Sequence, residues 1–262
     1  MAGLKIAAVG HVEWIEFVEV DHVPAAGQIA HGIDSWDEPG GGGAVVAAQL
    51  ARLAGSCDFF TALGDDDYGH RSVERLEEFG VTVHAQWFGR TRRALVHVDR
   101  NRERTITTVG PKLRAAGPLP LEGYDTVFFV SGDVAALRSA RQARFLGATP
   151  REAAILLEGG VHLDLLVGSG SDPGERYEGG LDVGVFVATE GARGGLANGE
   201  RYEPAEPPGP LEDTYGAGDS FAATLCFALG RGDSLPDALE LASRAGAAVV
   251  TGKGPYSAQI TL

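Results

Sequence analysis

The sequence feature that most constrains the fold is a glycine-containing turn followed at once by an apolar helix, LEDTYGAGDSFAATLCFAL at residues 211–229. Gly216 and Gly218 lack a Cβ atom, so an anion can approach the backbone around Ala217 closely. The start of a helix also has unpaired backbone N–H groups and a partial positive charge, which bind anions. The segment therefore predicts an anion-binding turn formed by Gly216, Ala217, Gly218 and Asp219, and phosphate is the expected anion.

Asp219 lies in the first turn of this helix, where the positive helix end is expected to favour the ionised carboxylate. An ionised carboxylate beside a bound phosphoryl group can accept the proton of an attacking hydroxyl. Asp219 is therefore the candidate general base. A bare GAGD fits equally well a glycine turn in which the aspartate only caps the helix.

The composition limits the partners of such a site. With 262 residues the chain is expected to form a single domain over residues 1–262. Its net charge of −14 argues against a nucleic-acid partner, because phosphate backbones bind basic surfaces. No apolar run reaches the length of a membrane span and the N-terminus does not resemble a signal peptide. We therefore expect a cytoplasmic protein without a membrane partner.

Apolar runs that indicate buried strands alternate with amphipathic segments along most of the chain. Residues 4–9 are continuously apolar, which is typical of a strand covered on both faces. Further strands are expected at 57–63, 126–130, 155–157, 163–167 and 183–188, and helices after Gly43, at 70–79, at 134–145 and after Ser234. This alternation predicts an α/β fold with a mainly parallel sheet between helices.

Two segments interrupt this alternation. Residues 11–33 contain one mixed strand followed by several prolines and glycines, and residues 81–110 contain short strands on either side of the turn Asn101-Arg102-Glu103. We predict that these two segments form a small β flap, or lid, over the site.

The string DTYGAGDSF resembles the signature of the ribokinase-like (PfkB) family of sugar and nucleoside kinases, D-T-x-G-A-G-D followed by a small residue and Phe. Asp213, Thr214 and the four residues of the anion-binding turn occupy its fixed positions. The resemblance extends over most of the chain, and its other motifs are matched at Gly40 and Gly41, at Gly64, Asp66 and Gly69, at Arg104 and Thr105, and at Thr189, Gly191 and Gly194.

The resemblance implies a ribokinase-like three-layer fold and ATP-dependent phosphorylation of a hydroxyl on a sugar or sugar-like molecule, with Asp219 as the base. It implies that ATP contacts Thr189, Gly191, Gly194, Asp213 and Thr214, and that the acceptor contacts Glu13, Gly40, Gly41 and Arg104. It also implies Mg²⁺, with Asp172 as the protein acid near it, a K⁺ ion near Asp213 as a further candidate, and a homodimer formed through the lid.

Three positions depart from the family pattern. Val45 stands where an Asn usually contacts sugar hydroxyls, and Ile15 stands where many members have an Asp. The N-x-x-E motif that helps to order magnesium falls at residues 169–172, where only the acid Asp172 is kept. Two alternatives therefore stay open, a nucleoside kinase on the same scaffold and a nucleotide-binding regulatory homologue with little or no activity.

Overall fold

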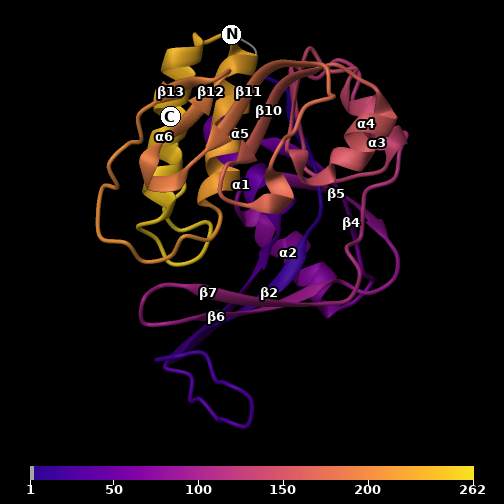
Figure 1. Cartoon of the computed structure of the whole chain (residues 1–262). Helices are drawn as coiled ribbons and strands as arrows, with labels where there is room; N and C mark the ends of the chain where they lie inside the picture. The colour runs from indigo at the N-terminus through magenta and orange to yellow at the C-terminus, as the bar shows by residue number, and fades with distance from the viewer. Residues whose placement is uncertain (1–2) are drawn as a thin grey trace.

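A nine-stranded sheet runs through the centre of the computed structural model, which describes residues 3–262 (Figure 1). The strand order is β13-β12-β11-β10-β9-β8-β1-β4-β5. In chain order these strands are β1 (Ile6–Val9), β4 (Cys57–Leu63), β5 (Val81–Trp87), β8 (Thr126–Phe129), β9 (Phe145–Ala148), β10 (Leu163–Ser169), β11 (Val183–Thr189), β12 (Gly195–Ala197) and β13 (Glu200–Tyr202). Neighbours from β5 to β11 are parallel, and β12 and β13 form an antiparallel hairpin at one edge. The predicted parallel sheet is confirmed.

Helices cover both faces of this sheet. One face packs against α1 (Gly42–Ala54), α2 (Asp67–Glu78), α5 (Ala217–Arg231) and α6 (Leu235–Val249), and the other against α3 (Val134–Ala140) and α4 (Ala153–Gly159). Strand β1 shows why, because Ile6 and Ala8 belong to one buried cluster and the alternate residues Ala7 and Val9 to the other. The fold is therefore the three-layer α/β arrangement that the sequence predicts.

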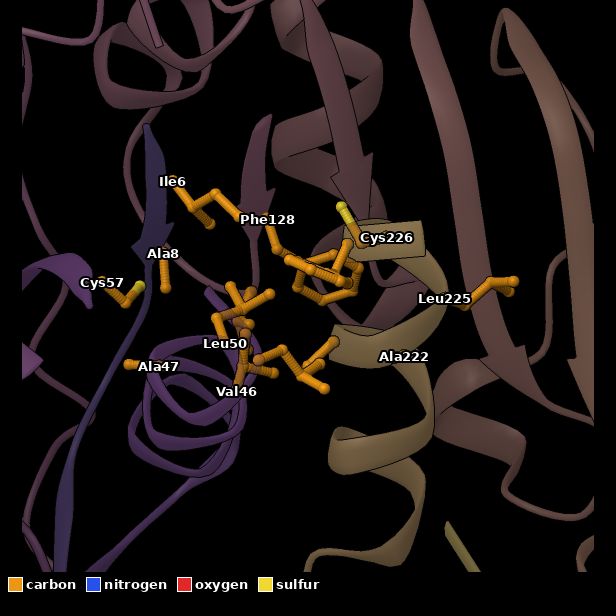
Figure 2. Close-up of a cluster of buried hydrophobic side chains, with 14 of the residues drawn as sticks. Ile6, Ala8, Val46, Ala47, Leu50, Cys57, Phe128, Ala222, Leu225 and Cys226 are labelled. Carbon is orange, nitrogen blue, oxygen red and sulfur yellow. The ribbon is translucent and has the colours of Figure 1, made fainter. Parts of the chain in front are cut away.

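The core between α1, α5 and the sheet fixes the position of the anion-binding turn. Figure 2 shows Val46 and Leu50 of α1 beside Phe128 of β8 and Cys226 of α5 in one apolar cluster. These four residues are fully or almost fully buried. Because α5 is held along its length in this way, its first turn has a rigid support.

The lid is a separate four-stranded sheet with the order β3-β2-β6-β7, and Figure 1 shows it below the main sheet. It comprises β2 (Glu13–Glu19), β3 (Asp34–Gly40), β6 (Arg93–Val98) and β7 (Arg104–Val109). Its small core contains Ile15, Phe17, Ala94, Val96 and Val98.

The predicted limits of the lid are wrong at two places. Residues 34–40 form β3, although we expected the lid segment to end at residue 33. Pro39 argues against a strand, but β3 is an edge strand and pairs only with β2, so a missing N–H can be tolerated there. Residues 81–87, predicted in the lid, form β5 at the edge of the main sheet. The partial burial of β5 gives it the alternating pattern of a lid strand.

Two further elements differ from the prediction. Residues 155–157, predicted as a strand, belong to helix α4, because a run of three apolar residues does not distinguish the two structures. The helix predicted over 134–145 ends at Ala140, and Phe145 already begins β9. Strand β9 is only four residues long and has no β-branched residue, so its sequence carries little strand signal.

None of the described helices combines the length and the apolarity needed to cross a membrane. Cys57 and Cys226 are free and buried, and burial raises the pKa of both thiols.

Candidate active site

The anion-binding turn begins at Gly216, whose φ of 83° is in the left-handed region that favours glycine. A Cβ here would lie 3.0 Å from Val45 Cγ1 and 2.9 Å from Pro255 Cβ, so the position also has no room for a side chain. The first bond of α5 runs from Ser220 N to Gly216 O at 2.9 Å. The N–H groups of Ala217, Gly218 and Asp219 therefore precede the helical ladder, and no side chain of the described residues caps the helix at Gly216.

Gly218 keeps the turn open. A Cβ at Gly218 would meet no atom within 4 Å, and its φ is not in the left-handed region. The space in front of the turn is thus available to a ligand. Of residues 216–219, Gly216 alone has a positive φ.

Asp219 lies at the opening of this turn, and burial raises its pKa to about 7. The nearby Glu175 also raises this pKa, and the guanidinium groups of Arg151 and Arg104 lower it. The expectation that the surroundings favour the ionised form is wrong in its net direction, because desolvation of the carboxylate, together with Glu175, outweighs the attraction of Arg151 and Arg104. A carboxyl group with a pKa near 7 is suited to accept a proton at neutral pH.

The glycine pair predicted to contact the acceptor lies next to Asp219. Gly40 ends β3, and Gly41, with φ 82°, caps α1. The Gly41 N–H donates to the Tyr215 hydroxyl at 3.0 Å. This bond joins residues 40–42, which we call the acceptor loop, to the segment that precedes the anion-binding turn. The following residue, Gly42, packs so closely that its Cβ would lie 2.8 Å from Asp219 Oδ1.

Tyr215 is a site residue that the sequence did not reveal. Its ring packs edge-on against Phe17 of the lid, with centroids 5.5 Å apart, and the Arg104 guanidinium lies 5.3 Å from its centroid. It therefore connects two lid strands with the acceptor loop. It occupies the variable position of the D-T-x-G-A-G-D pattern, so no motif could have identified it.

The structure brings both predicted lid residues to this edge of the site. Arg104 begins β7 and contacts Tyr215, and its charge also acts on Asp219. Glu13 begins β2, is paired in register with Gly40, and has its Oε1 3.2 Å from Arg92 Nε. Burial raises the pKa of Glu13, although Arg92 and Lys112 oppose the shift.

Two residues that depart from the family pattern, Val45 and Ile15, are apolar and buried beside the acceptor loop. Val45 is fully buried and packs against Gly216. Ile15 is also buried, and a Cβ at Gly40 would lie 2.3 Å from Ile15 Cδ1. Neither side chain can hydrogen-bond a hydroxyl, so the acceptor must be recognised by other groups.

The residues predicted to contact the nucleotide lie at the end of β11 and in the turn that follows it. Thr189 ends β11, and Gly191 and Gly194, both at positive φ, form the turn that leads into β12. A Cβ at Gly194 would lie 2.2 Å from Tyr202 O, which packs this turn against the segment after β13. A cavity of about 430 Å³ adjoins that segment, and its lining includes Tyr202, Glu203, Pro204, Leu239 and Ser243.

Asp213 has one carboxylate oxygen in use and one without a partner. Its Oδ1 accepts a hydrogen bond from Tyr215 N at 2.9 Å, and Thr214 lies between the two residues. Its Oδ2 is buried and has no hydrogen-bond partner in the part of the chain that the structure describes. A buried carboxylate oxygen without a donor is suited to hold a cation.

Asp172 already has cationic and backbone partners. The Arg151 guanidinium lies 2.5 Å from its Oδ2, and its Oδ1 accepts from Gly174 N at 2.8 Å. Arg151 also pairs with Glu175 at 2.7 Å. Arg151 Nη2 thus joins Asp172 to a second acid, Glu175. Between residues 3 and 262, no three His, Cys, Asp or Glu side chains are grouped so that they could hold a metal ion.

Comparison with known proteins agrees with this geometry. Residues 4–157 and 179–262 match the family described as pfkB family carbohydrate kinase, and Asp172 falls between the matched segments. The chain is 30% identical to the ATP-dependent ribose-1-phosphate kinase of Halopiger xanaduensis, over 97% of this chain and 95% of that protein.

Two solved structures have the same fold. The nucleoside kinase of Methanocaldococcus jannaschii superposes with a TM-score of 0.79 at 16% identity, and covers 100% of this chain and 96% of its own. The ribokinase of Arabidopsis thaliana, solved with ribose and ATP, gives 0.76 at 21% identity, with 100% and 96% covered. The fold and the matched motifs define a kinase of the ribokinase-like class. The chain belongs to the pfkB family of carbohydrate kinases.

Proposed function

We propose that this protein transfers the terminal phosphoryl group of ATP to a hydroxyl of a sugar or sugar-like molecule at the anion-binding turn. The observation that carries the proposal is the placement of Asp219 between two glycine-lined surfaces. On one side are the free N–H groups of residues 217–219, and on the other is the acceptor loop at Gly41 and Gly42. A hydroxyl held by that loop would have a base and a phosphate site within reach.

Each group then has a defined role. Asp219, with its pKa near 7, accepts the hydroxyl proton as the oxygen attacks phosphorus. The backbone N–H groups of the turn stabilise the negative charge on the transferred phosphoryl group. Arg104 adds positive charge from the lid, and Tyr215 positions the Gly41 backbone beside the base.

The nucleotide is proposed to lie over the turn at Thr189 to Gly194. The adjoining cavity combines apolar side chains, Leu239 and Pro204, with the hydroxyl of Ser243, which suits the face and the edge of a nucleobase. Mg²⁺ supplies charge neutralisation of the ATP phosphates when bound. It usually keeps several waters and needs few protein ligands, and Asp172 or Glu175 could serve it only by exchanging the contact with Arg151.

The Asp213 carboxylate fits the proposed K⁺ site, because its Oδ2 is buried without a donor at the base of the same turn. A cation there would favour anion binding at the adjacent N–H groups.

A sugar or a nucleoside could be the acceptor, and plain ribose is expected to be a poor one. Val45 and Ile15 offer no polar partner to its hydroxyls, and each missing partner costs about 1–3 kcal/mol. A screen of sugars, sugar phosphates, polyols and nucleosides for acceptor-dependent ADP release tests the proposal. Turnover with a sugar-type acceptor supports it, and turnover only with nucleosides selects the nucleoside kinase. ATP binding without turnover on any acceptor selects the regulatory homologue. The cytoplasmic location and the homodimer through the lid stay predictions.

A further inference from the structure

Three cations lie on the two chain segments that connect the lid to the main sheet. Arg92 directly precedes the lid strand β6, and Lys112 and Arg114 follow the lid strand β7. The second connection joins the body again at Ala115, which forms a bridge with Gly132 after β8. We call Arg92, Lys112 and Arg114 the hinge cations.

The hinge cations are only partly matched by acids. Lys112 Nζ and Arg114 Nη2 both lie 3.3 Å from carboxylate oxygens of a single residue, Glu152, which also accepts from Ser131 Oγ at 3.0 Å. Arg92 faces Glu13 at 3.2 Å. Three cations thus meet two carboxylates, which leaves one positive charge when both acids are ionised. In a chain with a net charge of −14, such a local excess is an attractive site for an anion.

The charges of the hinge cations act on a buried imidazole, His11, which borders the acceptor loop. A Cβ at Gly41 would lie 3.2 Å from His11 Nε2, and Glu13 Oε1 is 3.7 Å from the same nitrogen. The His11 side chain is only 8% exposed, and its Nδ1 has no hydrogen-bond partner within residues 3–262. A neutral imidazole can place its N–H on either nitrogen, so His11 can donate to an anion that reaches Nδ1.

The cluster is also open to a ligand. The Arg114 side chain is 47% exposed, and those of Lys112 and Arg92 are 18% and 19% exposed. Guanidinium and ammonium groups of this kind bind the oxygens of a phosphate monoester. The bridging acid Glu152 is mostly buried, so it supports Lys112 and Arg114 from the protein side.

We infer that the acceptor carries a phosphate group of its own, which the hinge cations and His11 bind while its hydroxyl lies at Gly41 and Asp219. This inference rests on the proposed function and specifies its acceptor as a phosphorylated sugar. Binding of one phosphate by residues of both connections would also draw the lid toward the main sheet. A phosphate contact of this kind would explain how the acceptor is recognised although Val45 and Ile15 cannot hydrogen-bond its hydroxyls.

The test compares matched pairs of acceptors in the ADP-release assay: ribose with ribose 1-phosphate and with ribose 5-phosphate, and fructose with fructose 6-phosphate. For at least one pair, kcat/KM of the phosphorylated member should exceed that of the plain sugar by about 100-fold or more. Lys112→Met and Arg114→Gln should each reduce this preference by about tenfold or more. Arg138→Gln, an exposed cation on α3 outside the cluster, is the matched control and should keep the preference.

A binding measurement separates this inference from the proposed function. Inorganic phosphate should raise the melting temperature of the wild type and of Arg138→Gln, and it should raise those of Lys112→Met and Arg114→Gln much less. If plain sugars match or exceed their phosphorylated forms, the inference is overturned, even if phosphate binds at the cluster. If no acceptor is turned over, the proposed function fails, and the phosphate-dependent melting shifts alone then decide whether the anion site exists. Equal shifts in all four proteins would mean that the hinge cations only fasten the lid.

Discussion

Gly42 and Asp219 are so close that a Cβ atom at position 42 would lie 2.8 Å from Asp219 Oδ1, and 3.1 Å from Val130 Cγ1 on its other side. The acceptor loop and the proposed base therefore define each other's positions. Gly42 is the second residue after Gly40 and begins α1, so the loop cannot shift without moving that helix.

Gly42→Ala should therefore lower kcat with little change in ATP affinity. The added methyl group would displace the Asp219 carboxylate, and a misplacement of about 1 Å can cost about 100-fold in rate. Initial-rate kinetics and nucleotide titration measure the two effects. Gly3→Ala is the control, because a Cβ at Gly3 meets nothing within 4 Å. An unchanged kcat in Gly42→Ala would show that the carboxylate can move without loss of function.

Asp219→Asn should lower kcat by about 10²–10⁴-fold and leave ATP binding largely intact, because the amide keeps the shape but cannot take the proton. Asp237→Asn is a matched control, since Asp237 lies in the first turn of α6, away from the anion-binding turn. If Asp219→Asn kept more than about half of the wild-type kcat, Asp219 would not be the base.

The raised pKa of Asp219 predicts the pH dependence of activity. In the free enzyme the carboxylate is ionised only above a pH of about 7, so kcat/KM should rise about tenfold per pH unit below 7 and level off above it. Glu175, Arg151 and Arg104 are the charges that act on this group. If kcat/KM instead levelled off above a pH of about 4, the ordinary range of the Asp pKa, the argument that burial raises the pKa of Asp219 would be contradicted.

The same shift predicts the pH dependence of stability. The folded carboxyl group holds its proton up to a pH of about 7, whereas the unfolded one releases it near 3.8. The folded state thus binds more protons in this window, and stability falls as the pH rises through it. The side chain of Asp219→Asn is neutral at every pH. The melting temperature of this variant, measured relative to that of the wild type, should therefore rise between pH 4 and pH 7 and stay constant above pH 7.

The sequence predicts those elements of this protein that have a recognisable local pattern of residues. The apolar run at 4–9 indicates a central strand, and the Gly216–Asp219 segment indicates a glycine turn at the start of a helix; both elements are observed. The binding of an anion at this turn stays a prediction. The alternating polar pattern of β5 hides its place in the main sheet, because an edge strand is covered on only part of its surface. Pro39 likewise hides β3, which only its edge position permits.

The candidate site is less visible in the sequence, because most of its groups come from distant segments. Tyr215 stands at a position where the family pattern accepts any residue. His11 and the hinge cations lie up to about a hundred residues apart and share no spacing, and only the fold brings them together. The net direction of the Asp219 shift also depends on burial, which a local motif does not report.

Tyr215→Phe should weaken acceptor binding more than ATP binding. The variant keeps the ring contacts with Phe17 and Arg104 but leaves the Gly41 N–H without its acceptor, which costs about 1–3 kcal/mol when the group is buried. A rise in the acceptor KM with an unchanged nucleotide Kd is expected. Tyr177→Phe, which removes a hydroxyl bonded to Leu181 near α4, is the control.

The last prediction is that a monovalent cation activates the enzyme through Asp213. The Asp213 Oδ2 atom is buried without a donor, and Oδ1 holds Tyr215 N just before the anion-binding turn. A K⁺ ion at Oδ2 would neutralise this carboxylate and strengthen phosphate binding at the turn. Turnover at fixed ionic strength should therefore be higher in K⁺ than in Na⁺ or tetramethylammonium. Asp213→Asn keeps an acceptor for Tyr215 N but loses the charge, so its rates in the three salts should converge. Equal wild-type rates in the three salts would rule out this role and leave Asp213 as a residue that only fixes the turn.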